Sequence, residues 1–135
     1  MIELPERVPG LRWLTALWGA YGAIWIAFEG DLRRVTLLGV AAALVAIGWL
    51  AQRYLGGSTL SRPHWITVAV LMGLAWGAGS VIFTLLFMAL KTGLHAHGPE
   101  FTAAEINWVW QQLALWTFAG GLAGLGTGLL VSSRR

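Results

Sequence analysis

Four long apolar stretches, each about as long as a bilayer is thick, constrain this chain more than any other feature. A helix needs about 20 residues to cross the hydrocarbon core of a membrane. The stretches cover residues 11–28, 35–55, 63–91 and 103–131, and away from their ends they contain no Asp, Glu, Lys, Arg or His. They predict an all-α integral membrane protein with four transmembrane helices in an up-down bundle and no β-sheet.

The boundaries of these stretches carry residues that begin and end helices. Gly56 and Gly57 follow the second stretch, and Pro63 opens the third at a position that tolerates proline. Thr102 and Glu105 have the spacing of a capping box at the start of the fourth. Because no linker or repeat separates the stretches, we expect residues 1–135 to form a single four-span domain.

The composition excludes several classes of protein. Hydrophobic residues make up 57% of the chain and charged residues 11%, whereas soluble domains average about 45–50% and about 25%. Such a composition cannot cover the surface of a small soluble enzyme. The absence of cysteine excludes a disulfide scaffold and thiolate catalysis. The basic residues lie singly or in pairs between apolar stretches, so we expect a lipid bilayer and no nucleic acid as partner.

The distribution of Lys and Arg predicts the orientation in the membrane. Cytoplasmic flanks of membrane proteins carry an excess of these residues. Four spans put both termini on one side, and that side carries Arg7, Arg12, Arg53, Arg62, Arg134 and Arg135. The other side carries Arg33, Arg34 and Lys91. The termini are therefore predicted to be cytoplasmic, and the richness in Arg, Ala, Gly and Leu favours a bacterial inner membrane.

Small residues gather on one face of each stretch at helical spacing. Membrane helices associate by close approach of their backbones, which small residues permit. The residues predicted to pack helices are Gly19, Ala23, Gly39, Ala43, Gly73, Gly77, Gly120, Gly124 and Gly128. They predict tight packing within the chain, although the glycine pattern of the fourth stretch also suits contact with another chain.

The first stretch also carries an aromatic face, formed by Trp18, Tyr21, Trp25 and Phe28. One interpretation is a surface that faces lipid or the protein core. The other is a docking face for a partner helix or for a flat hydrophobic molecule such as a quinone or pigment. The sequence leaves both open and indicates no particular cofactor.

The loop between the third and fourth stretches contains most of the potential chemistry. His95 and His97 could both bind one zinc or copper ion, or could hydrogen-bond to backbone carbonyls or lipid headgroups. Glu100 is interpreted as a solvated charge, and Glu105 as the capping partner of Thr102. Lys91 is expected to extend from the helix end towards the interface.

The absence of ionisable residues inside the stretches argues against a proton-coupled transporter, and we expect no enzyme. The favoured function is structural, as a homo-oligomer or as an accessory subunit packed on other subunits of a larger respiratory or photosynthetic membrane complex. One alternative is a small channel or carrier for a neutral or hydrophobic solute, lined by Thr15, Ser80, Thr84 and Thr117. The other is a metal site at His95 and His97.

Overall fold

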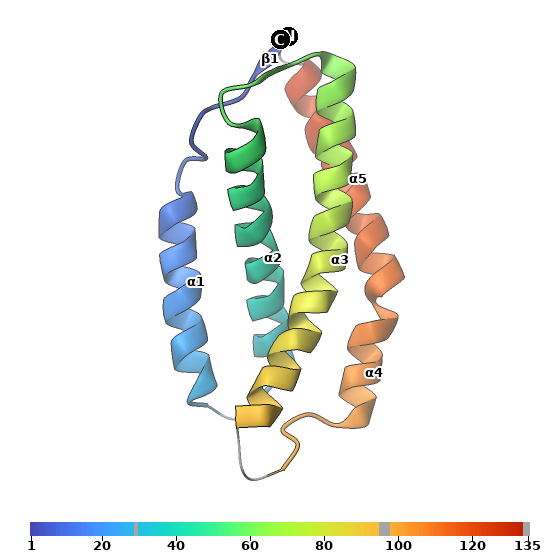
Figure 1. Cartoon of the computed structure of the whole chain (residues 1–135). Helices are drawn as coiled ribbons and strands as arrows, with labels where there is room; N and C mark the ends of the chain where they lie inside the picture. Colours follow the sequence, from blue (N-terminus) through green and yellow to red (C-terminus); the bar gives the residue numbers. More distant parts are fainter. Residues whose placement is uncertain (29, 95–97, 134–135) are drawn as a thin grey trace.

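The computed structural model describes residues 1–28, 30–94 and 98–133, and this part of the chain is almost entirely helical (Figure 1). The helices are α1 (Leu11–Ile26), α2 (Leu32–Leu55), α3 (Arg62–Leu94), α4 (Ala103–Gln111) and α5 (Leu113–Ser133). Two short strands complete the described elements, β1 (Ile2–Glu3) and β2 (Thr59–Leu60). The all-helical fold class predicted from the sequence is therefore confirmed apart from these strands.

Three of the predicted spans are long and apolar enough to cross a membrane, which indicates a multi-pass membrane protein. They are α2, α3 and the segment Ala103–Ser133, in which α4 continues into α5 with only Gln112 between them. The first predicted span is shorter than expected, because α1 has 16 residues, a length of about 24 Å. It ends early because the N–H groups of Ala27 and Phe28 bond to the carbonyls three residues before them, Ile24 and Trp25, which tightens the last turn.

The prediction that the chain has no β-sheet is wrong. β1 pairs with β2 in an antiparallel two-stranded sheet, in which Ile2 lies opposite Leu60 and Glu3 opposite Thr59. The N–H of Leu4 extends the pairing by donating to the carbonyl of Ser58, 2.9 Å away. Strands of two residues are too short to produce an alternating pattern in the sequence. Their pairing joins segments far apart in the chain and depends on the helices between them.

α3 is the central helix of the molecule. It packs along α5 on one side and along α2 on the other, while α1 packs mainly against α2. Successive long helices run in opposite directions, so β1 and the end of α5 lie at the same end of the molecule (Figure 1). The end of the molecule opposite the termini contains the buried hydrophobic core cluster. Its fully buried members are Trp25, Val35, Leu38, Val81, Met88, Phe101 and Val109.

Glycines bring the backbones of α3 and α5 into direct contact. A Cβ atom added to Gly73 would lie 2.9 Å from the carbonyl carbon of Gly120 and 3.0 Å from the Cα of Gly124. A Cβ added to Gly77 would lie 2.6 Å from the carbonyl carbon of Trp116. Real Cβ atoms do not approach backbone this closely, so any side chain at these positions forces the two helices apart.

A similar contact joins α2 to α3. A Cβ on Gly39 would lie 2.6 Å from the backbone nitrogen of Thr84 and 2.8 Å from its Cα. Thr84 is itself fully buried. Next to this contact, Ala43 is buried and its Cβ faces Gly79 of α3. α3 is thus held between two neighbours whose small residues allow its backbone to approach closely.

We predict that Gly73→Ala lowers the free energy of unfolding by about 3 kcal/mol, the upper range for an overpacked interior. The added methyl group meets the backbone of α5 and cannot be accommodated by a change of rotamer. Reversible unfolding in mixed micelles, followed by tryptophan fluorescence, measures the change. Gly126→Ala is the matched control, because a Cβ at Gly126 meets nothing within 4 Å. Equal losses in the two variants would contradict the backbone contact.

Candidate functional site

An apolar groove runs between α1 and α3 in the half of the molecule away from the termini. Its volume is about 380 Å³. The α1 side is lined partly by small residues, Gly19, Gly22 and Ala23, and the α3 side by the larger Phe87 and Leu90. The groove exists because α1 packs mainly against α2 and leaves much of its own surface uncovered.

The small-residue surface of α1 has few contacts within the chain. A Cβ added to Gly19 meets nothing within 4 Å, and Ala16, Ala20 and Ala23 are exposed. Gly22 lies closer to α2, with the Cδ1 of Leu38 at 3.5 Å from its added Cβ. Gly19 and Ala23 therefore differ from Gly39, Gly73, Gly77, Gly120 and Gly124, which all lie against backbone of a neighbouring helix.

The four residues of the predicted aromatic face do not share one environment. Trp25 is only 3% exposed and Trp18 is half-buried, whereas Tyr21 is 39% exposed and Phe28 54%. Residues seven apart lie almost in line on a helix, and residues three apart are turned by about 60°. This turn separates the two pairs, so that Trp18 and Trp25 face inwards and Tyr21 and Phe28 face outwards.

The inward-facing tryptophans pack against α3 and α2. Both rings contact Phe87, with centroids 6.3 Å from Trp18 and 6.5 Å from Trp25. The indole Nε1–H of Trp18 donates to the carbonyl of Leu38, 3.2 Å away. Because an indole N–H usually needs a partner when it is buried, this bond fixes the orientation of α1 against α2.

Lys91 also lines the groove and is fully buried. Its Nζ donates to the carbonyl of Trp25 at 3.0 Å and to the carbonyl of Phe28, and it lies 4.4 Å from the centre of the Trp25 ring. The expectation that Lys91 extends to the interface is therefore wrong. The carbonyl end of a helix carries partial negative charge, and the end of α1 attracts the ammonium group into the protein.

The loop after α3 also differs from the sequence prediction. Glu100 is not a solvated charge, because its Oε2 accepts a hydrogen bond from the N–H of Gly30 at 2.6 Å. The neighbouring Phe101 is buried in the core. The loop is thereby attached to the segment between α1 and α2. The capping box is confirmed, because Thr102 accepts from the N–H of Glu105 and Glu105 accepts from the N–H of Thr102.

His95 and His97 lie outside the residues that the structure describes, so the metal hypothesis remains a prediction. Within residues 1–28, 30–94 and 98–133, no group of three or more His, Cys, Asp and Glu side chains could hold a metal ion.

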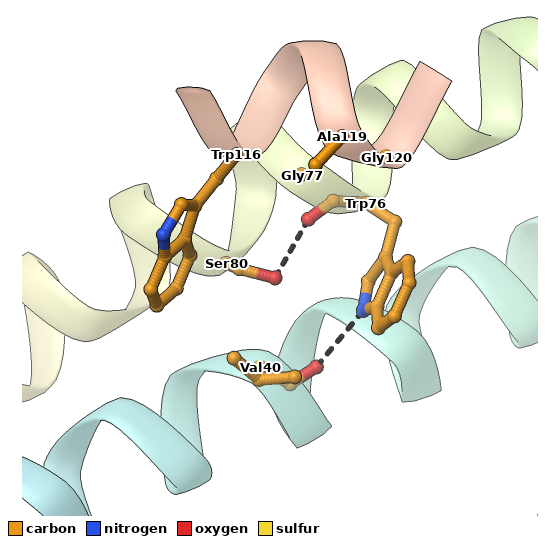
Figure 2. Close-up of a pocket in the computed structure, with 7 residues that line it drawn as sticks. All are labelled: Val40, Trp76, Gly77, Ser80, Trp116, Ala119 and Gly120. Carbon is orange, nitrogen blue, oxygen red and sulfur yellow. Dashed lines mark hydrogen bonds between the residues drawn. The ribbon is translucent and has the colours of Figure 1, made fainter. Parts of the chain in front are cut away.

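A second hollow, of about 320 Å³, lies between α2, α3 and α5 at mid-height (Figure 2). Figure 2 shows Trp76 and Trp116 on its two sides, with Ser80 between them. The Nε1–H of Trp76 donates to the carbonyl of Val40 at 3.3 Å, and the Oγ–H of Ser80 donates to the carbonyl of Trp76 at 2.7 Å. These polar groups bond to backbone, so the hollow presents a mainly apolar surface.

The hydroxyl groups considered for a solute path all donate to their own helices. Each bonds to the carbonyl four residues earlier, at distances between 2.6 and 2.8 Å: Thr15 to Leu11, Ser80 to Trp76, Thr84 to Ser80 and Thr117 to Leu113. Thr15 also accepts from the Nε1–H of Trp49 at 2.9 Å. Their hydrogens are therefore committed to backbone carbonyls and are not offered to a solute.

Sequence reasoning missed the tryptophan bonds to α2 and the roles of Lys91 and Glu100. A weak signal existed for Lys91, since a cation in the last turn of a long apolar helix suits a carbonyl-rich helix end. No known protein family, no curated protein and no solved structure matches the chain.

We predict that Lys91→Met lowers the free energy of unfolding by about 3 kcal/mol, the scale of hydrogen bonds made by a charged donor. Methionine has a similar length but cannot donate to the carbonyls of Trp25 and Phe28. Thermal and denaturant unfolding in micelles measure the effect. Arg34→Met is the control, because Arg34 is an exposed cation at the same end whose ion pair with Asp31 spans 3.6 Å and contributes less than about 1 kcal/mol. Similar losses in both would contradict a structural role for Lys91.

Proposed function

We propose that this chain is a small structural subunit of a membrane, built to bind another transmembrane helix in the groove between α1 and α3. The partner is a second copy of the chain or a subunit of a larger membrane complex, of which respiratory and photosynthetic complexes are the proposed examples. The observation that carries the proposal is the small-residue surface of α1, where a Cβ added to Gly19 would meet nothing within 4 Å.

Helices that associate in lipid do so differently from helices in water. Lipid tails are as apolar as leucine, so association depends on close backbone approach rather than on hydrophobicity. The glycines at 39, 73 and 120 already lie against backbone within the chain. The surface around Gly19 offers the same close approach to a helix from outside. The larger side chains of Phe87 and Leu90 form the opposite wall, which suits a ridge of side chains inserted between the two helices.

The short length of α1 supports the same proposal. We propose that α1 crosses the membrane in addition to the three longer spans and completes an up-down bundle of four. Its length of 16 residues is less than the thickness of a typical hydrocarbon core. A short span can adjust by thinning the bilayer or by associating with other helices. A partner helix along α1 would cover exposed surface and relieve this mismatch.

We propose cytoplasmic termini in a bacterial inner membrane. The end with β1 carries Arg7, Arg12, Arg53 and Arg62, all exposed. At the other end two arginines are exposed, Arg33 and Arg34, of which Arg34 pairs with Asp31, and Lys91 is buried within the protein. Exposed cations next to the spans favour the cytoplasmic side, and this difference supports the proposed orientation.

We predict that Gly19→Leu abolishes the association while leaving the unfolding of the chain itself nearly unchanged, because a Cβ at Gly19 meets nothing within 4 Å and the rest of the leucine side chain occupies the open groove. Blue-native electrophoresis in mild detergent, and co-purification of two differently tagged copies, measure association and separate self-association from binding to another subunit. Gly126→Leu is the matched control, since a Cβ at Gly126 on α5 also meets nothing within 4 Å. A homogeneous wild-type monomer without a partner would contradict the proposal.

We predict that the protein reconstituted in liposomes gives no flux of glycerol or other small neutral solutes above that of empty vesicles. The committed hydroxyl groups and the absence of ionisable residues away from the ends of the spans support this expectation. Stopped-flow light scattering measures the flux. A flux that falls in Thr84→Val, which removes a fully buried hydroxyl, would favour the channel alternative.

A further inference from the structure

The segment before α1 is held against the end of α2, and this contact creates a hollow at the terminal end of the molecule. The N–H of Val8 donates to the side-chain carbonyl of Gln52 at 3.0 Å. A Cβ on Gly56 would lie 2.8 Å from the carbonyl oxygen of Glu6, so the segment and the end of α2 touch. The pairing of β1 with β2 secures the same segment from its other side.

Two adjoining hollows result, and three arginines line them. The larger has a volume of about 660 Å³ and is lined by Arg7 and Arg53. The smaller, of about 190 Å³, is lined by Arg7 and Arg12, and both share Gln52. Glu6 also lines the larger hollow, which leaves an excess of positive charge. In the described parts of the chain, none of these arginines lies within ion-pair distance of a carboxylate.

The larger hollow is amphipathic along its length. Ala46, Trp49, Leu50 and Arg53 all line it, and their spacing of three and four residues puts them on one face of α2. The hollow is therefore polar at its mouth, beside Arg53, and has an apolar floor that extends two helical turns back towards Ala46. Trp49 and Trp13, which line the two hollows, are of the residue type that collects at the level of lipid headgroups.

From this arrangement we infer that the hollow beside Arg7, Arg12 and Arg53 is a binding site for an anionic phospholipid. The arginines bind the headgroup phosphate, for which the guanidinium group offers paired donors. One acyl chain lies along Leu50 and Ala46. Basic pockets at the membrane surface bind anionic lipid headgroups in this manner. The site is independent of the proposed partner helix, because it is formed by α2 and the amino-terminal segment rather than by the groove between α1 and α3.

Native mass spectrometry of the full chain, released from micelles containing phosphatidylglycerol or phosphatidylcholine, tests the site. We expect the wild-type chain to retain phosphatidylglycerol at least tenfold more tightly than phosphatidylcholine. The double variant Arg7→Gln/Arg53→Gln should lose this retention by roughly 30-fold, about fivefold for each arginine. The variant Arg7→Lys/Arg53→Lys, which keeps the charge, should recover a large part of it.

The matched control is Arg33→Gln/Arg62→Gln, which removes the same charge from two exposed arginines that do not line the hollows. Its phosphatidylglycerol retention should equal that of the wild-type chain. Equal loss in the control and the test variant would overturn the site, because the attraction would then come from overall charge. Displacement of the lipid by glycerol 3-phosphate at equal concentration would also overturn it, since the apolar floor would then contribute nothing and a free phosphate would bind as well.

Discussion

Direct backbone contact between α3 and its neighbours is the constraint on which the rest of this structure depends. Burial of apolar surface does not hold helices together in a bilayer, so close approach and a few hydrogen bonds must do so. Gly73 and Gly77 bring α3 onto the backbone of α5, and Gly39 brings α2 onto the backbone of α3 at Thr84. With these contacts in place, α3 forms the centre of the molecule, and α1 is left at the edge beside α2.

Several polar side chains stabilise this arrangement by bonding to backbone. Trp18 and Trp76 approach α2 from α1 and α3 and donate to its carbonyls at Leu38 and Val40. Lys91 does the same for the end of α1. An unpaired polar group is costly in an apolar medium, so these bonds stabilise the packing. They also leave little polar surface inside the molecule with which a solute could interact.

Two of the surfaces that remain open once the chain has packed on itself differ in chemistry. The groove beside Gly19 is apolar and lies at the level of the spans, where a helix could contact it. The hollow beside Arg7 and Arg53 is basic at its mouth and lies at the terminal end of α2. A membrane offers partners of both kinds, other helices at its centre and anionic headgroups at its surface. The groove thus faces the bilayer interior, where a helix is its proposed partner, and the basic hollow faces the bilayer surface, where an anionic phospholipid is its proposed ligand.

The helical class, the approximate spans and the capping box at Thr102 could be predicted from the sequence alone, because they depend on composition and on contacts within a few residues. Periodicity also identified the small-residue faces, but it could not say which of them other helices would cover. A Cβ added to Gly73 meets the backbone of α5, whereas a Cβ added to Gly19 meets nothing within 4 Å. Four features depend on the packing of the helices: the burial of Lys91, the bond from Gly30 to Glu100, the sheet of β1 and β2, and the basic hollow. Each of these joins groups more than forty residues apart in the sequence, so it depends on how the helices align, which no local pattern encodes.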